Sequence, residues 1–393
     1  MTVIGNIITT KAAKILALFS IAWLAACEPI PTSSTNSGQS LDLSDPIPVA
    51  LLVPSGSGNE SDAFLATNLE NAARLAIADL QGVEIDLRVY STAANSEIAA
   101  QAAVQAVSDG AKVIIGPLYS EAANAAGVAV APLNVNVLTF SNNTAIAGGN
   151  VFVLGSTFQN TANRLVSYAA SQGVTNFVIV HGEDLPGSVG RDAITNAIRN
   201  QGSILSGVQS YPLSQQGILD QAPVMASVIN TSGAQAVFMT GEIKRDLPIV
   251  ATALPERGVD PTFVRSYGLT RWDVAPENLA IPGLQGGVFA MPDQTVSNGF
   301  QARYTATYGG TPHPIAGLAY DGIAAIGALA ASGNAEALTT AGLTQPQGFQ
   351  GTSGIFRLFA DGTNERGLAV AQVQNNQVVI LEPAPRSFAG VGF

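Results

Sequence analysis

The sequence predicts an α/β protein with two doubly wound, parallel-sheet lobes. Apolar runs alternate with helical patterns along most of the 393-residue chain. The run Ile47–Val53 is almost wholly apolar, as expected for a strand covered on both faces. Leucine and alanine then recur at helical spacing over 65–80. Because strands and helices alternate in two such series, from Ile47 and from near Phe158, we expect two parallel sheets.

Each series contributes several elements to its lobe. The first predicts helices at 65–80, 97–108 and 120–128, and strands at 47–53, 85–90, 112–115 and 136–140. The second predicts helices at 161–171, 189–201, 216–231 and 243–257, and strands at 177–181, 207–211, 236–240 and 263–267. Residues 287–291 and helices at 300–308 and 319–331 are expected to return to the first lobe, with Asp321 as a helix cap.

The C-terminal stretch predicts a β-hairpin region. Short strands at 354–358, 367–373 and 377–381 are separated by the turn dipeptides Asp361-Gly362 and Asn375-Asn376. The expected division is a signal at 1–27, a flexible tether at 28–46, a first lobe at 47–157 with 285–340, and a second lobe at 158–284 with 341–393.

Composition excludes several classes of function. Hydrophobic residues make up 47% and charged residues 11%, which excludes disorder over most of the chain. The single Cys allows no intrachain disulfide and no Cys-based zinc site, and His181 and His313 are too few for a His-rich metal centre. A net charge of −11 argues against a nucleic-acid partner. We expect no metal and no cofactor.

The N-terminus predicts an export signal. Lys11 and Lys14 precede an apolar run of ten residues, too short for a bilayer, which needs about 20. Leu24-Ala25-Ala26-Cys27 resembles the lipobox of bacterial lipoproteins, which implies lipidation of Cys27 and a periplasmic, membrane-anchored protein. Glu28, where an inner-membrane protein often has Asp, favours the outer membrane. A plain secretory signal or a buried first helix stays an alternative.

Three stretches carry a resemblance to a known family. They are "VALLVPSGSG" at 49–58, "GAKVIIGPLYSEA" at 110–122 and "NFVIVHGEDLPGSVGRDA" at 176–193. Over about 47–393 the chain resembles the type I periplasmic binding proteins, the leucine/isoleucine/valine-binding family. The resemblance implies two lobes joined by three crossovers, with a ligand held in a cleft that closes by hinge motion.

A narrower resemblance concerns the lipoprotein activators of penicillin-binding proteins. It rests on "GAKVIIGPLYSEAANAAG", "GSTFQNTANRLVSYAASQG", "SYGLTRWD", "AYDGIAAIGAL" and "FQGTSGIFRLFADGTNERGLAV". Two functions therefore stay open. The lipid anchor favours a protein that docks on a peptidoglycan synthase and activates it, and this is the function we expect. The alternative, favoured by the breadth of the family, is capture of a small polar solute, such as an amino acid, for an ABC permease.

Three loops at strand ends predict a ligand site in the first lobe, because ligands bind beyond the carboxyl ends of parallel strands. They hold Ser57, the pair Tyr119 and Ser120, and the pair Asn142 and Thr144. A flexible turn, a helix cap at Ser120 and a plain polar loop are the structural alternatives. In the family, a small residue and a Thr of the third loop hold the ligand; Thr144 matches the Thr, and Asn142 replaces the small residue.

The second lobe departs from the amino-acid-binding pattern. The family's aromatic residue after the strand ending at His181 is missing from 184–187, and its acid is missing near 267–270. Tyr267 stays a candidate, and Glu242 and Asp273 are candidate substitutes for the acid. Trp272 is either a cleft anchor, a partner contact or a packing residue, and His181 and His313 are expected to be structural. The chain shows no catalytic motif, so we expect no enzyme.

Overall fold

The computed structural model describes residues 37–388. The export signal, Cys27 and residues 28–36 of the predicted tether lie outside these residues. The rest of that tether, 37–46, is not free of the first lobe, because Leu41 joins the lobe's core and Ser37 Oγ donates to Asn136 Oδ1 at 2.5 Å.

The first sheet is wholly parallel, in the order β2-β1-β3-β4-β5. Its strands are β1 (Ile47–Val53), β2 (Ile85–Ser91), β3 (Val113–Ile115), β4 (Asn136–Thr139) and β5 (Val151–Val153).

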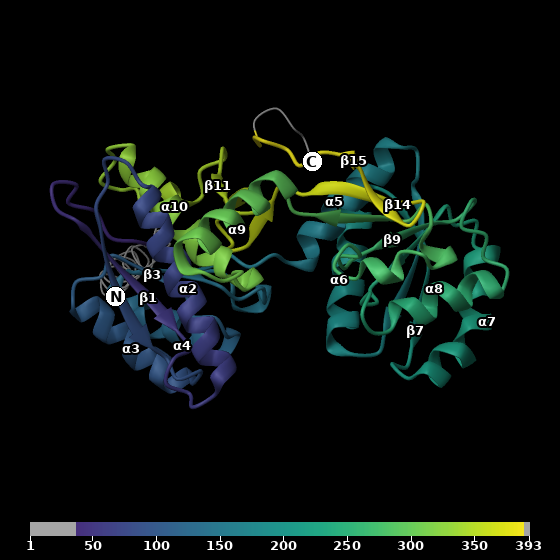
Figure 1. Ribbon diagram of the computed structural model, residues 1–393, viewed down its shortest axis with the longest axis horizontal. Helices are drawn as coiled ribbons and strands as arrows, with labels where there is room; N and C mark the ends of the chain where they lie inside the picture. Colours follow the sequence, from purple (N-terminus) through teal and green to yellow (C-terminus); the bar gives the residue numbers. More distant parts are fainter. Residues whose placement is uncertain (1–36, 389–393) are drawn as a thin grey trace, which may run out of the picture. The chain divides into compact units, whose positions relative to one another are not determined.

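Helices cover both faces of the first sheet. On one face, α2 (Glu60–Asp79) and α10 (Gly317–Ala331) pack together over Leu51 and Ile115 (Figure 1). On the other, α3 (Ser96–Ser108) and α4 (Ser120–Val130) pack over Leu52 and Ile114. The remaining helices of this lobe are α9 (Gln294–Tyr308), α11 (Thr340–Leu343) and the short turns η1 (Ala131–Leu133), η2 (Thr144–Ile146) and η5 (Pro314–Ala316).

The second sheet has the order β15-β14-β10-β9-β8-β6-β7. Its parallel part comprises β6 (Asn176–Gly182), β7 (Ile204–Tyr211), β8 (Ala236–Met239), β9 (Arg265–Gly268) and β10 (Val288–Met291). The antiparallel strands β14 (Ala369–Gln374) and β15 (Gln377–Glu382), yellow in Figure 1, extend it. Around it lie α5 (Phe158–Ser171), α6 (Leu185–Asn200), α7 (Gln215–Thr231), α8 (Leu247–Glu256), η3 (Pro276–Asn278) and η4 (Pro282–Leu284).

These two sheets confirm the predicted fold class. Along the described residues the chain passes from one lobe to the other three times, after β5, after β10 and after the small sheet of β11 (Phe349–Gly351), β12 (Gly354–Leu358) and β13 (Asn364–Arg366). Both predicted hairpin turns lie between paired antiparallel strands, β12–β13 and β14–β15. By length and composition the stretch Pro314–Ala331 could cross a membrane, but 61% of it is buried as the core helix α10.

Strand pairing corrects the expected places of two segments. Residues 287–291 form β10, which pairs with β9 and β14 in the second sheet, so the chain returns to the first lobe only after Met291. The segment 349–358 packs with the first lobe, because Phe349, Phe356 and Leu358 join the core around α2 and α10. The other lobe boundaries stay a prediction.

Two further local expectations were wrong. Asp321 is not a helix cap; it lies inside α10, fully buried, with Arg366 and Thr352 as partners. Helix α8 begins at Leu247 rather than near 243. Asp246 Oδ1 accepts the Glu242 N–H at 2.9 Å and closes a turn before the helix.

Candidate functional site

A pocket of about 600 Å³ lies at the carboxyl ends of the strands in the first lobe. Its volume is in the range of small-molecule sites. The residues around it are Leu118, Tyr119, Ser120, Phe140, Ser141, Asn142, Asn143, Gly155, Ser156, Arg271, Pro292, His313, Pro314, Ile315, Gly317, Leu318, Thr352, Ser353 and Arg366. The pocket therefore combines the loops after β3 and β4 with η5, the start of α10, the chain crossovers and Arg271 from the loop after β9.

The loop after β3 turns sharply into α4. Gly116 has a φ of +90°, and a Cβ there would lie 2.3 Å from the carbonyl oxygen of Leu52, so only glycine fits. The helix starts at Ser120, with Tyr119 at the N-cap, and no side chain caps it. Among the described residues, the Ser120 hydroxyl has no hydrogen-bond partner. The uncapped N–H groups and this hydroxyl form a site suited to an anion.

Asp62 fixes the position of Tyr119. The Tyr119 phenol donates a hydrogen bond to Asp62 Oδ1, from the first turn of α2, and the Asp62 side chain is buried. This hydrogen bond, together with partial burial, raises the pKa of Tyr119 to about 12. The ring is 40% exposed. Tyr119 is therefore a neutral aromatic wall of the pocket at physiological pH.

The loop after β4 is held by its own hydrogen bonds. The Thr139 hydroxyl donates to the carbonyl of Pro117 at 2.7 Å, and Ser141 Oγ accepts the Asn143 N–H at 3.1 Å. Asn142 remains exposed on the pocket wall. Thr144 begins η2 and does not line the pocket. Nor does Ser57, whose hydroxyl accepts the Asn59 N–H at 3.1 Å.

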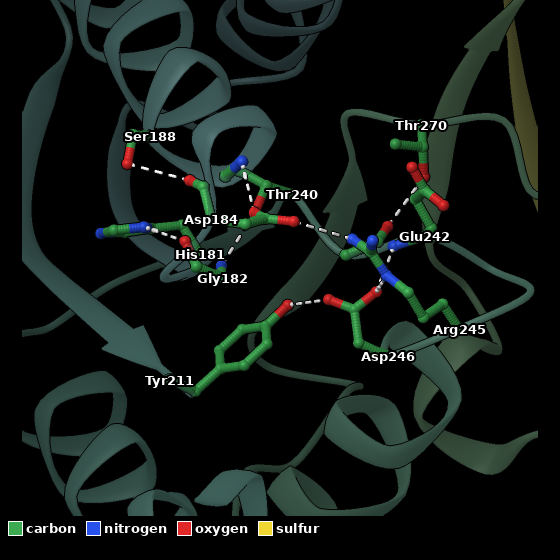
Figure 2. A network of polar contacts seen from close by, with 12 residues as sticks. His181, Gly182, Asp184, Ser188, Tyr211, Thr240, Glu242, Arg245, Asp246 and Thr270 are labelled. Carbon is green, nitrogen blue, oxygen red and sulfur yellow. Dashed lines mark hydrogen bonds and ion pairs between the residues drawn. The ribbon is translucent and has the colours of Figure 1, made fainter. Parts of the chain in front are cut away.

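In the second lobe, two carboxylates that follow strand ends, Asp184 and Asp246, both form ion pairs with Arg245 (Figure 2). Asp184 caps α6 through Gly187 N–H at 2.8 Å and forms an ion pair with Arg245 at 3.1 Å. Asp246 accepts the Tyr211 phenol at 2.6 Å and lies 3.4 Å from Arg245 Nε. Burial, then the bond to Asp246, raises the pKa of Tyr211. Thus Arg245 joins two carboxylates into one network.

The other second-lobe candidates do not line the pocket. Glu242 is exposed and does not line it, and Asp273 pairs with Arg271, with Nε and Oδ1 3.0 Å apart. Tyr267 is fully buried between Phe177 and Phe238, in the hydrophobic core, so its expected ligand contact is not supported. Trp272 is also a core residue.

Of the predicted ligand residues, the pocket brings together Tyr119, Ser120 and Asn142. Sequence reasoning missed Arg271 and Arg366, and it treated His313 only as a loop residue. Arg366 comes from β13, inside a stretch that carries the activator resemblance, but no ligand role was predicted for it. His313 stands between two prolines, and its Nδ1 accepts the Ile315 N–H at 3.3 Å. His181 is structural, as expected, with Nδ1 2.9 Å from the Gly182 carbonyl oxygen.

The sequence pattern of the periplasmic binding protein family matches residues 46–377. The chain therefore belongs to the periplasmic binding proteins, which confirms the resemblance inferred from the sequence. This family is one of solute-binding proteins, and membership places the folded part of the chain in the periplasm. Among curated proteins no match was found.

Solved structures share the fold at low sequence identity. One is a branched-chain amino acid ABC transporter periplasmic ligand-binding protein from Burkholderia xenovorans, with 17% identity and a TM-score of 0.64, covering 86% of this chain and 96% of that one. A substrate-binding protein from Desulfitobacterium hafniense, in complex with Leu, has 18% identity, a TM-score of 0.58 and coverages of 86% and 100%.

A third similar structure holds a different ligand. It is a solute-binding protein of an ABC transporter from Rhodopseudomonas palustris, in complex with 3,4-dihydroxybenzoic acid. It has 17% identity and a TM-score of 0.53, and it covers 86% of this chain and 98% of that one.

Proposed function

We propose that this protein is a non-catalytic solute receptor that binds a small carboxylate-bearing molecule and delivers it to an ABC permease. The observation that carries the proposal is the pocket at the uncapped N-terminus of α4. There Ser120, in the first turn of a helix that no described side chain caps, lines a cavity of about 600 Å³. A helix N-terminus favours an anion through its free donors and its dipole.

The ligands named for two similar structures support this proposal. Leu and 3,4-dihydroxybenzoic acid have little in common except a carboxylate group on a small body. A carboxylate accepts hydrogen bonds from a hydroxyl and from N–H groups, and such charge-assisted bonds are the strong ones. Asn142 and Asn143 add amide groups to the same wall.

A thermal-shift screen of the full-length protein tests the proposal. The panel contains amino acids, aliphatic and aromatic carboxylic acids, and uncharged sugars. A ligand at about 100 times its dissociation constant stabilises the folded state by about 2.7 kcal/mol. We expect at least one carboxylate to raise the melting temperature while the sugars leave it unchanged. If only sugars, or no compound at all, shift the transition, the proposal is wrong.

Ser120→Ala is expected to weaken binding of the carboxylate found in that screen by about tenfold or more. A hydrogen bond to a charged group contributes about 1.5–3 kcal/mol, and each 1.4 kcal/mol is a factor of about ten. Isothermal titration calorimetry measures the change. Ser57→Ala is the matched control, because Ser57 follows β1 in the same lobe but does not line the pocket. Equal losses in the two variants would contradict the assignment.

The activator function is a second candidate, favoured by one observation. In the second lobe, Asp184 and Asp246 are already paired, so the acid expected for an amino-acid ligand is missing there. If the protein is an activator, we expect that no small molecule shifts its melting temperature and that a penicillin-binding protein is retained on the immobilised full-length chain. Failure to retain one, together with a carboxylate ligand in the screen, would remove this candidate.

A lipid anchor at Cys27 is part of the proposal. Cys27→Ser is expected to move the protein from the membrane fraction to the soluble periplasmic fraction, because an acyl-modified cysteine would hold it at the membrane. Cell fractionation followed by immunoblotting measures the change, with the unchanged chain as the control. The anchor would be refuted if both chains stayed in the same fraction. Sedimentation of the unchanged chain with inner or outer membranes distinguishes the two sites.

A further inference from the structure

We infer that the pocket selects small organic acids without an ammonium group over the corresponding amino acids. The inference rests on the proposed function, and it names the class of solute. It follows from where the structure places the acidic side chains of both lobes. Each group that could balance a ligand ammonium is either absent from the pocket wall, already paired, or open to solvent.

Within residues 37–388, the pocket wall offers no counter-charge for a ligand ammonium. None of the described residues that line the pocket is Asp or Glu, while Arg271 and Arg366 both line it. Their partner carboxylates, Asp273 and Asp321, lie outside the lining. Arg271 Nε is 3.0 Å from Asp273 Oδ1, and Arg366 Nη1 is 3.0 Å from Asp321 Oδ2. Because both guanidinium groups are already paired and no carboxylate of the described chain lines the pocket, a ligand ammonium would lose water without gaining a counter-charge.

In the second lobe, the hydrogen-bond network around Arg245 makes two more carboxylates unavailable to a ligand. Asp246 is buried and takes both the Tyr211 phenol and the Glu242 N–H, at 2.6 and 2.9 Å. Asp184 accepts the Gly187 N–H in the first turn of α6 with Oδ1 and forms an ion pair with Arg245 through Oδ2 (Figure 2). If either carboxylate turned toward a ligand, Arg245 would lose a partner. If Asp246 did so, the buried Tyr211 phenol would also lose its hydrogen-bond acceptor.

Asp293, next to the pocket residue Pro292, caps α9 and accepts the Thr295 N–H at 2.9 Å, so it is already paired. Asp62 and Glu242 are two further acids. Asp62 touches the pocket residue Tyr119, but it is buried and accepts the Tyr119 phenol. Glu242 is exposed and does not line the pocket, and an exposed ion pair contributes little because water screens it. None of these three acids therefore replaces a buried counter-charge for an amine.

The rest of the wall accommodates an apolar body. Leu118, Phe140, Ile315 and Leu318 line the pocket together with the exposed part of the Tyr119 ring. A carboxylate at Ser120 with an aliphatic or aromatic remainder would therefore contact polar groups at one end and apolar side chains along the rest.

Matched ligand pairs test this inference on the full-length protein. The pairs are leucine with 4-methylpentanoate, phenylalanine with 3-phenylpropanoate, and glutamate with glutarate. We expect the amine-free acid to bind about tenfold or more tightly than its amino acid in the pair with the highest affinity, as measured by calorimetry. An amino acid that binds as tightly as its partner acid, or more tightly, would overturn the inference and leave the proposed function intact. If none of the compounds binds and no other carboxylate does, both fail.

A variant of the second-lobe network tests the cause of the preference. Arg245→Met removes the ion-pair partner of Asp184 Oδ2 and leaves Asp246 held by Tyr211 and the Glu242 N–H, so we expect the freed Asp184 to reduce the preference for the amine-free acid. Lys244→Met is the matched control, since it removes the same charge from an exposed neighbour and is expected to leave the preference unchanged. Circular dichroism checks that both variants fold. An unchanged ratio in folded Arg245→Met would overturn the role assigned to this network.

Discussion

Replacing Asp321 with alanine is expected to lower the free energy of unfolding by about 3–5 kcal/mol, the usual cost of breaking a buried ion pair from one side. Asp321 is fully buried in α10, with Oδ2 3.0 Å from Arg366 Nη1. Its Oδ1 also accepts the N–H and the hydroxyl of Thr352, at 2.6 and 3.0 Å. The substitution would leave the buried Arg366 without its counter-charge. Chemical denaturation followed by circular dichroism measures the loss.

Glu70→Ala is the matched control for this substitution. Glu70 forms an ion pair with Arg74 one helical turn away, but both side chains are partly exposed, at 35% and 52%. Exposed pairs contribute about 0–1 kcal/mol, so this variant should be almost as stable as the unchanged protein. A loss in Asp321→Ala no larger than that in Glu70→Ala would show that the buried pair does not hold α10 to β13.

A double variant separates the charge from the packing. Asp321→Leu with Arg366→Met removes both charges, and buried ion pairs can often be replaced by apolar side chains of similar size. We expect it to be more stable than Asp321→Ala. The recovery should be partial, because the guanidinium of Arg366 also donates to the Leu154 carbonyl, with Nε at 3.1 Å. Greater loss in the double variant would contradict an uncompensated charge as the cause.

Much of the fold could be predicted because buried parallel strands have a strong sequence pattern. The continuous apolar run at Ile47–Val53 is an example, since both of its faces are covered. The strand at Val288–Met291 could be predicted as a strand but not assigned to its sheet, because its pairing partners are chosen by tertiary packing. Val151–Val153 is too short for periodicity to reveal it.

The candidate site could be predicted only where side chains follow strand ends. Ser120 and Asn142 were found in this way, because the carboxyl ends of parallel strands meet at one edge. Thr144 belongs to the same loop as Asn142, but the local geometry of η2 takes it out of the pocket lining. Arg366 could not be found, because its place in the pocket depends on a partner 45 residues away, Asp321.

Replacing Trp272 with alanine is the second substitution with a large expected effect. The sequence alone left three roles for Trp272: a cleft anchor, a partner contact or a packing residue. The structure shows that its side chain is fully buried. Its ring centroid lies 5.5 Å from that of Phe289, and a Cβ added to Gly268 would lie 2.3 Å from Trp272 Cε2. We expect a loss of about 3–5 kcal/mol in unfolding free energy, measured by chemical denaturation, because a large cavity would remain.

Two other substitutions distinguish packing from the alternatives. Trp272→Phe should lose less than Trp272→Ala, since it keeps a ring, and among the described residues the indole N–H has no hydrogen-bond partner to lose. Phe263→Ala, at a side chain that is 81% exposed, should change stability by no more than about 0.5 kcal/mol. A cleft anchor predicts the opposite for Trp272→Ala, namely weaker ligand binding at unchanged stability. Measuring both quantities on the same variant therefore decides between a residue that builds the second lobe and one that binds the ligand.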